Sequence, residues 1–459
     1  MFQLRFLNMR RLPDRDRQMT KISDNNRKTF HAASHVAMIL ITFYAASAIA
    51  QSSARTFLLL TDAVELAVTN HPSLAALDAT TQAMATLPSQ VSALPDPVLS
   101  VNAMNLPTNT FDLDQEPMTQ IQIAISQSLP FPGKRELRQE AAHSEVRAAD
   151  ARRKEQRNTL IAQVRSAWWR LFSLDRAIEI VAHNKDLMRD FIEIAQSKYT
   201  VGRGLQQDVL LAQLELSRVL EREIHLIGQR RSGAAVLNGL LSRHPQTTIV
   251  LAQSPPSTQL PLLPGIDELI GQAHDARDLL TVHRNLLAAA QSRTALAKRD
   301  RYPDFKVGAG YGIRDGDDPV RGGNRADFFS VMFSINLPVY SKGKQDKAVA
   351  QRISEQHQHT LSLDDSYRAI SAEIGGRLAS YQSAKEQVDL LNNTIVPQAQ
   401  QTVNSMLAGY QVNEVDFLNV VNGQLMLFNA QISYWFALSE AKQSLSKLAA
   451  TVGMESLYE

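Results

Sequence analysis

The feature that most constrains this chain is the stretch from residue 133 to residue 199, which has no proline and, after Gly133, no glycine. A continuous helix of this length would extend roughly 100 Å at about 1.5 Å per residue. Apolar residues recur in it at alternating spacings of four and three, which is typical of a coiled-coil seam. The series is Leu160, Val164, Ala167, Leu171, Leu174, Ile178, Val181, Met188, Ile192, Ala195 and Tyr199, with Lys185 as the exception.

A second series of the same kind predicts a second long helix. It consists of Leu363, Tyr367, Ile370, Ile374, Tyr381, Ala384, Val388, Leu391 and Ile395, with Arg377 as the exception. Each long helix is expected to end in a glycine-containing turn, at Gly202-Arg203-Gly204 and near Gly409. Return helices should then run from residue 206 to about 242 and from residue 415 to about 451. The chain is therefore expected to form two antiparallel helical hairpins.

The chain also repeats itself at an offset of 208 residues. Three landmarks carry the repeat: Pro95-Asp96 and Pro303-Asp304, Leu129-Pro130 and Leu337-Pro338, Asp208-Val209-Leu210 and Asp416-Phe417-Leu418. Three landmarks at one offset indicate two homologous halves. We predict a first structural repeat in residues 51–253, a Pro-rich linker in residues 254–264 and a second repeat in residues 265–459.

Each half is expected to begin with a helix and to continue with two strands. The helices are predicted over residues 61 to about 86, interrupted at His71-Pro72, and over residues 265 to about 299. Alternating apolar residues predict strands over residues 98–106, 118–129, 305–313 and 327–337. Pro130, Pro132 and Pro338 would end strands and turn the chain into helices. The predicted fold class is mainly α with a small β part.

An apolar run over residues 36–50, VAMILITFYAASAIA, indicates export. It is shorter than the roughly 20 residues of a membrane-spanning helix, and Ala48-Ile49-Ala50 has the form of a signal-peptidase site. We predict a signal peptide in residues 1–50, the alternative being an uncleaved anchor. Residues 1–50 contain eight Lys and Arg against three Asp and Glu, so their removal changes the net charge from +2 to −3.

Composition excludes several classes of protein. The chain has no cysteine, which excludes disulfides, thiolate metal sites and a lipid-anchored cysteine. A net charge of +2 is too small for nucleic-acid binding by charge alone. No phosphate loop, Ser-His-Asp pattern or HExxH motif occurs, and His357 and His359 point to different sides of a helix. We therefore expect no enzyme, no cofactor, no bound metal and no nucleic-acid partner.

The predicted strands raise a problem of closure. Strands of about 9–11 residues have the length of outer-membrane barrel strands, but four of them cannot close a barrel. Either they form a small soluble sheet, or several copies of the chain share one barrel. Three chains would supply twelve strands, although spacing alone does not determine the number three.

The chain resembles the TolC-like outer-membrane efflux proteins. The junction Gln127-Ser128-Leu129-Pro130-Phe131-Pro132-Gly133-Lys134-Arg135 is similar to that of the heavy-metal (CzcC-like and CusC-like) branch. Tyr199, Gly202 and Asp208-Val209-Leu210 are similar to the family's tip turn. The resemblance implies a homotrimer with long coiled-coil hairpins in an α-barrel and four strands per chain in a shared transmembrane β-barrel. It also implies outer-membrane lipid around the barrel, a periplasmic adaptor and an inner-membrane resistance-nodulation-division pump as partners.

The resemblance places the periplasmic aperture and the adaptor-docking tips at two turns. The residues concerned are Gly202, Gly204, Leu205, Asp208, Gly409, Tyr410, Asp416 and Asn419. Asp208 and Asp416 could cap helices or form an acidic ring that selects cations. Relatives often have two carboxylates one turn apart at the second tip, whereas Asn419 follows Asp416 here, which puts a double acidic ring in doubt.

These features predict the outer-membrane exit duct of a tripartite efflux system, located in the outer membrane and extending into the periplasm. The predicted cargo is heavy-metal cations. Two alternatives stay open at this point: the same duct serving drug or protein export, and a soluble periplasmic coiled-coil scaffold.

Overall fold

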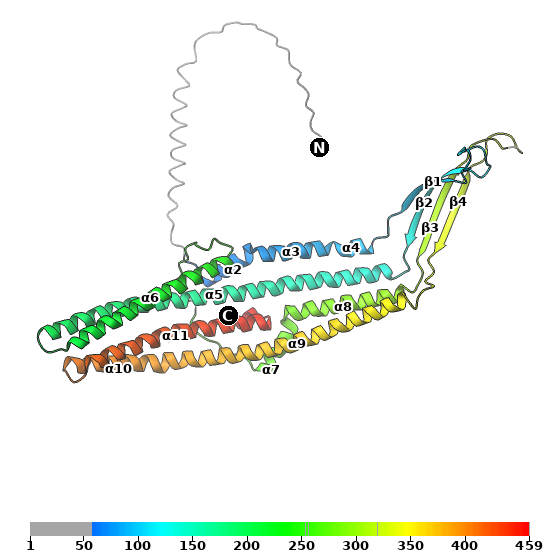
Figure 1. The fold of residues 1–459 in the computed structure, drawn as a ribbon. Helices are drawn as coiled ribbons and strands as arrows, with labels where there is room; N and C mark the ends of the chain where they lie inside the picture. Colours follow the sequence, from blue (N-terminus) through cyan, green and yellow to red (C-terminus); the bar gives the residue numbers. More distant parts are fainter. Residues whose placement is uncertain (1–56, 253, 256, 319, 459) are drawn as a thin grey trace, which may run out of the picture. The chain divides into compact units, whose positions relative to one another are not determined.

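The computed structural model describes residues 57–458 apart from residues 253, 256 and 319, so the predicted signal peptide lies outside the described residues. The elements of the first half are α2 (Leu60–Asn70), α3 (Pro72–Ala85), α4 (Leu87–Ser92), β1 (Val98–Met104), β2 (Gln120–Leu129), α5 (Lys134–Thr200) and α6 (Gln206–Leu240) (Figure 1). Those of the second half are α7 (Ile266–Ala276), α8 (Asp278–Arg299), β3 (Phe305–Ile313), β4 (Phe328–Ile335), α9 (Gln345–Leu390), η1 (Leu391–Ile395), α10 (Val396–Gln411), α11 (Phe417–Val452) and η2 (Glu455–Leu457). The predicted fold class, mainly helical with a small sheet, is confirmed.

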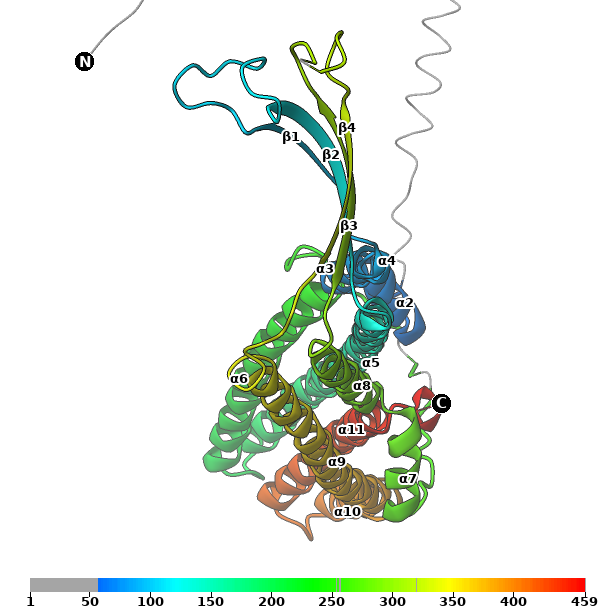
Figure 2. The same cartoon turned by 90° about the vertical axis from the view of Figure 1, so that its right-hand side faces the viewer.

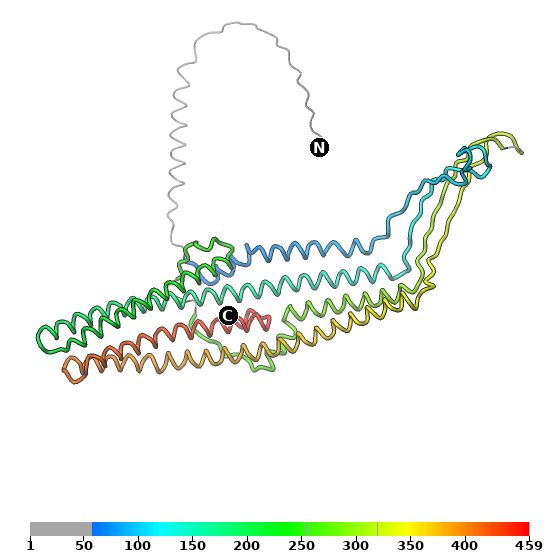
Figure 3. Tube along the Cα trace, in the orientation of Figure 1, coloured from blue at the N-terminus to red at the C-terminus, as the bar shows by residue number. Residues whose placement is uncertain are grey.

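The long helices form the two predicted hairpins. Helix α5 contains 67 residues and reverses into α6, and α9, η1 and α10 run without a break into the turn before α11. The four strands lie at one end of α5, and both hairpin turns lie at the other end (Figure 3). None of the described helices combines the length and hydrophobicity that a bilayer-spanning helix requires.

Both initial helices are interrupted. Pro72 starts α3, and the His71 ring nitrogen Nδ1 accepts a hydrogen bond from the Ser73 backbone N–H at 3.3 Å, which caps the new helix. In the second half the break falls at Arg277, whose backbone is extended. No proline marks that break, so the sequence pattern did not predict it.

The second long helix contains a π-helical turn, η1, which ends two residues before Pro397. Proline has no N–H to donate and its ring crowds the preceding turn, which disfavours a regular α-helix. A single π turn inserts one extra residue and relieves this conflict. The insertion also shifts the helix face, and Ile395, predicted to lie in the seam, is partly exposed.

The coiled-coil seams follow the predicted spacing with two local shifts of register. At the predicted exception Lys185, the buried residue is its neighbour Asn184, whose Oδ1 accepts a hydrogen bond from the Gln424 amide of α11 at 3.0 Å. At Arg377, the buried residue is Leu378. At both sites the buried position moves by one residue. At the first site it moves toward the N-terminus, so the spacings between buried residues are three and then four instead of four and then three. At the second site it moves toward the C-terminus, so the spacings are four and then three instead of three and then four. Tyr199, at the end of the first predicted series, is exposed.

Four antiparallel strands form one sheet in the order β1-β2-β3-β4. Directly paired residues share a face, so the register places Leu99 beside Ile125, Ile123 beside Tyr311, and Tyr311 beside Phe329. This face is apolar. The other face carries mostly small and polar residues, together with the apolar residues Val98, Phe328 and Met332. The small and polar residues are Ser100, Gln122, Ala124, Ser126, Gly308, Gly310, Gly312, Ser330 and Ser334. Side chains at Gly308 and Gly310 would press on the neighbouring strand, which explains two of the strand glycines.

The main core lies where α5 meets α2, α6 and α11. Trp168 and Trp169 are both 1% exposed and pack edge to face, with ring centroids 5.4 Å apart. The Trp168 indole N–H donates to the Leu58 carbonyl at 3.1 Å, and the Trp169 indole N–H donates to the Tyr458 hydroxyl at 2.6 Å. The tryptophans therefore pack at a helix interface, as expected, and hold both ends of the described chain against α5.

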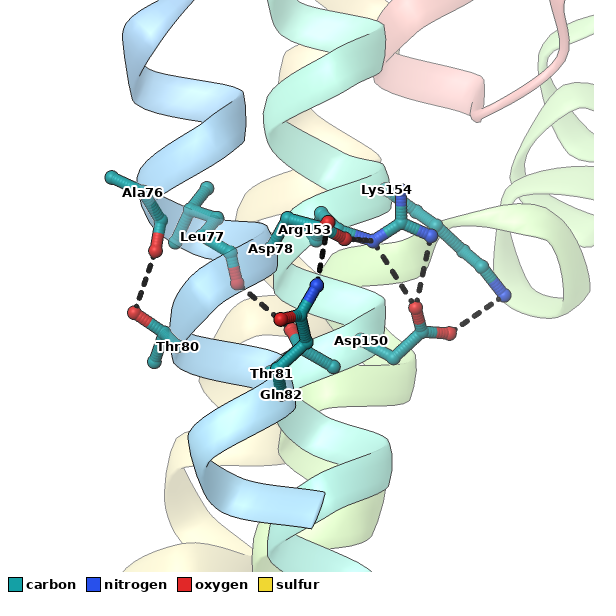
Figure 4. Close-up of polar contacts among 9 residues, drawn as sticks. All are labelled: Ala76, Leu77, Asp78, Thr80, Thr81, Gln82, Asp150, Arg153 and Lys154. Atoms are coloured by element: carbon teal, nitrogen blue, oxygen red, sulfur yellow. Dashed lines mark hydrogen bonds and ion pairs between the residues drawn. The ribbon is translucent and has the colours of Figure 1, made fainter. Parts of the chain in front are cut away.

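Helix α3 has no buried residue, and besides the apolar contact of Leu74 with the core it makes polar contacts with α5. Arg153 of α5 lies between Asp78 of α3, at 3.8 Å, and Asp150 of its own helix, at 3.1 Å (Figure 4). These are partly exposed ion pairs, so each contributes little to stability.

Helices α5, α11 and α9 form a layer, and α2, α7 and the C-terminal segment lie on one side of it (Figure 2).

Candidate functional site

The first hairpin turn ends α5 with a glycine in the left-handed conformation. Gly202 has φ +72°, its N–H donates to the Tyr199 carbonyl at 3.0 Å, and the Arg203 N–H donates to the Lys198 carbonyl at 2.8 Å. This pair of hydrogen bonds is a Schellman motif, which satisfies carbonyls at a helix end. Gly204 is also constrained, because a Cβ there would lie 3.0 Å from the Lys198 Cβ.

The second turn uses the same motif, but with asparagine instead of glycine. Asn413 has φ +63°, its N–H donates to the Tyr410 carbonyl at 3.2 Å, and the Glu414 N–H donates to the Gly409 carbonyl at 2.9 Å. Gly409 and Tyr410 therefore belong to the last turn of α10. The prediction that these two residues form the turn between the two helices was wrong. Asparagine tolerates the left-handed region because its short polar side chain bonds locally.

The two turns differ in the residues that follow the motif. Helix α6 begins after its N-cap Leu205, which makes Asp208 the third helical residue. Helix α11 begins after its N-cap Asp416, which makes Asn419 the third helical residue. Asp208 therefore corresponds in structure to Asn419, and the sequence match between Asp208 and Asp416 is displaced by three residues.

This placement gives the two aspartates different roles. The Asp208 carboxylate accepts a hydrogen bond from the Leu205 N–H at 3.4 Å, so it contributes to capping α6. Asp416 makes no capping hydrogen bond through its side chain and is exposed. Asn419 is also exposed, and its backbone N–H donates to the Asp416 carbonyl at 3.1 Å.

The structure joins the two tips through Lys198, a residue that sequence reasoning missed. Its ammonium lies 3.7 Å from the centre of the Tyr410 ring and donates to the Asn413 side chain at 3.1 Å and to the Tyr410 carbonyl at 3.4 Å. A cation over an aromatic face is attracted by the ring quadrupole. Burial raises the pKa of Tyr410, and the negative charge of Asp208 raises it further. The first hairpin therefore contacts the second at the tip.

An aromatic contact lies directly behind this link. The buried Phe417 ring packs against Tyr410, with centroids 5.7 Å apart, and against Phe191 of α5, at 6.0 Å. Residues 191 and 417 belong to different hairpins, so no local spacing could have paired them.

For Lys198, the sequence offered only a weak signal of its role at the tip. Lys198 directly precedes the predicted tip residue Tyr199.

At the opposite end of α5, a buried lysine fastens the strands to the helices. Lys134 is 3% exposed, and its ammonium lies 2.9 Å from Asp304 and 3.3 Å from Asp300. Burial alone would raise the pKa of Asp304, but hydrogen bonds from the Phe131 N–H and from Lys134, together with the lysine charge, hold it below its usual value. The first-half junction motif thus binds the start of the second strand pair.

The apolar face of the sheet is an uncovered hydrophobic surface. Leu99, Val101, Phe329, Val331 and Phe333 are 65% to 77% exposed. Soluble monomeric proteins rarely expose apolar residues in such a continuous patch. Strands that alternate between an apolar outer face and a polar inner face are typical of outer-membrane proteins. The strands are therefore suited to contact lipid on one face and water on the other.

Comparison with known proteins agrees with this geometry. The model of the outer membrane efflux protein family matches residues 63–242 and 269–454. The cobalt-zinc-cadmium resistance protein CzcC of Cupriavidus metallidurans is 22% identical over 327 residues, which cover 70% of this chain and 74% of CzcC.

Two solved structures show the same fold. The structure of CusC has a TM-score of 0.72 at 16% identity and covers 87% of this chain and 93% of its own. The structure of the outer membrane protein VceC from Vibrio cholerae has a TM-score of 0.70 at 19% identity, covering 87% of this chain and 97% of its own. The family model extends over both halves of the chain, which decides against a soluble scaffold. The chain belongs to the outer membrane efflux protein family and is a non-enzymatic efflux channel of the outer membrane.

Proposed function

We propose that this channel is the exit duct for heavy-metal cations in a tripartite efflux system. Three copies would close the duct, each contributing four strands to a shared barrel and two hairpins to a helical tube. A periplasmic adaptor would dock on the tips, and an inner-membrane resistance-nodulation-division pump would deliver the cargo. Within this proposal, residues 51–253 and 265–459 are the two repeats, joined by the linker at residues 254–264.

The observation that carries the metal assignment is the similarity to CzcC, a cobalt-zinc-cadmium resistance protein, over 70% of the chain. The fold itself does not distinguish cargo, because the CusC and VceC structures resemble the chain about equally. Export of drugs or of proteins through the same duct therefore stays the second candidate.

Deletion of the gene should lower the growth-limiting concentration of zinc, cobalt, cadmium or copper, because uptake would no longer be balanced by export. The measurement is growth of the deletion strain on each metal and, in parallel, on a panel of drugs. The strain should have no second duct of this family, and re-expression of the wild-type chain is the control. Unchanged metal tolerance together with lost drug tolerance would replace the metal cargo with drugs.

We further propose that the tips form the periplasmic aperture and that Lys198 holds them together. The residues assigned to this aperture are Gly202, Gly204, Leu205, Asp208, Gly409, Tyr410, Asp416 and Asn419. The contacts of Lys198 with Tyr410 and Asn413 support this proposal, because they are the polar contacts that link the two hairpins at the turns.

Replacing Lys198 with methionine should raise the ion conductance of the purified channel in planar bilayers by about two- to fivefold. Methionine fills similar space but removes the charge that binds the Tyr410 ring, a contact of about 0.5–2 kcal/mol. The matched control is Lys347→Met, an exposed lysine near the start of α9, far from the turns along the helix. Equal conductance in both variants would show that the tips do not limit passage.

A further inference from the structure

A cavity of about 500 Å³ lies against the face of α5 that carries Gln163 and Arg170. At about 100° per residue, this face points away from the one that carries Trp168, where the segments that cover the helical layer are attached. The cavity is formed by α5, α6, α9 and α11 and includes the side chains of Gln163, Ser166, Arg170, Glu373, Arg377 and Lys447. The covering segments are held on the other side of the same helices. There, Trp168 of α5 bonds Leu58, Tyr381 of α9 bonds Pro261, and Lys442 of α11 bonds Gln259.

This arrangement decides which side of the layer faces the interior of a closed tube of helices. Helices α2 and α7 and the segment after α11, which contains the short η2, lie on one side of the layer (Figure 2). Leu58, Gln259 and Pro261 are bonded to the same helices there. A duct stays open only if its inner face carries no such covering. The face with the cavity is therefore the inner one, and three chains would repeat the cavity three times around the duct.

The charges in this cavity do not cancel. Arg277, which also lines it, is paired with Glu155 at 2.7 Å, and Arg377 lies 3.5 Å from Glu373. Glu373 is the one carboxylate among the lining residues. Arg170 and Lys447, by contrast, have no carboxylate within ion-pair distance among the described residues. Each chain thus contributes to the inner face at this level two positive charges that have no ion-pair partner among the described residues.

We propose that this cavity is a binding site for small anions such as chloride, phosphate or a carboxylate, and that it makes the middle of the duct selective for anions. The inference rests on the proposed duct. Arg170 and Lys447 are exposed, and positive charges on the wall of a duct raise the local concentration of anions and repel free cations. Metal cations would then pass this level with counter-anions or as anionic complexes.

The test is the ratio of chloride to potassium permeability of the purified channel in planar bilayers under a tenfold KCl gradient. Wild type should prefer chloride, and the double variant Arg170→Gln/Lys447→Gln should lower the ratio at least about twofold, with a smaller difference at high salt because of screening. The matched control is Arg157→Gln/Arg284→Gln. It removes the same charge from the covered face, where Arg157 pairs with Glu455 and Arg284 bonds the His274 carbonyl of α7.

The outcomes separate the inference from the proposed function. A wild-type protein that forms no channel would overturn the duct and the anion site together. Channels whose permeability ratio is the same in wild type and in the inner-face variant, or that respond equally to both double variants, would overturn the anion site alone. The single variants Arg170→Gln and Lys447→Gln should each give part of the change, and they replace the double variant if it does not fold. Arg170→Lys/Lys447→Arg should keep the wild-type ratio.

Discussion

Replacing Trp168 with alanine is expected to destabilise the folded chain by about 3–5 kcal/mol, the usual cost of removing a fully buried tryptophan. The side chain is 1% exposed and stacks on Phe172, with ring centroids 5.2 Å apart. Its loss would leave a cavity and would also remove the hydrogen bond to the Leu58 carbonyl. The segment before α2 would then lose its attachment to α5.

The measurement is the midpoint of thermal unfolding followed by circular dichroism at a fixed protein concentration, since assembly makes the midpoint depend on concentration. Trp435→Ala is the matched control, because Trp435 is only partly buried and touches the same Phe172 ring at 5.8 Å. We expect the control to shift the midpoint by less than half as much. Equal midpoints for Trp168→Ala and wild type would contradict the central role of this cluster.

The second large effect is expected at Gly453, where alanine should cost about 2–5 kcal/mol. Gly453 follows α11 with φ +85°, and a Cβ there would lie 2.7 Å from the Ala276 carbonyl oxygen. The left-handed conformation costs a non-glycine residue about 1–2 kcal/mol, and overpacking against rigid backbone adds about 1–3 kcal/mol. The residue also ends a Schellman motif, in which the Met454 N–H donates to the Ala449 carbonyl at 3.0 Å.

Gly239→Ala provides the matched control. Gly239 lies inside α6, and a Cβ added there would meet no atom within 4 Å, so alanine should leave stability unchanged or raise it by up to about 1 kcal/mol. The same thermal midpoint distinguishes the two variants. If Gly453→Ala unfolds at the same temperature as Gly239→Ala, the close approach of α11 to the break between α7 and α8 does not limit stability.

Much of the fold was predictable because it depends on local patterns. The absence of Pro and Gly after Gly133 predicted α5 to within one residue at its C-terminal end. Alternation, which is clean in the two returning strands, helped to predict all four strands, with β3 matched at both ends. Helical and strand periods are properties of consecutive residues, so they can be read without knowing which segments meet. The division of the chain into repeats and the assignment of the aperture stay predictions.

The errors arose where contacts between distant segments decide the structure. Asn184 is buried instead of Lys185 because Gln424, on the other hairpin, provides a hydrogen-bond partner for its amide. Lys185 is satisfied outside the seam by Glu223, at 2.7 Å. The break at Arg277 likewise depends on its partner Glu155 in α5. None of these partners can be identified from spacing along the chain.

By itself, the amino-acid sequence determined the element types, the two long hairpins, the alternating strands and the membership of a duct family. Only the tertiary structure decided that Asp208 corresponds to Asn419, that Lys198 links the two tips, and that Arg170 and Lys447 lie together in one cavity. The physical reason is that periodicity reports which face of a helix is buried, whereas side-chain pairing depends on the axial register between helices. That register is set by packing over the whole length of the hairpins, and no single segment contains it.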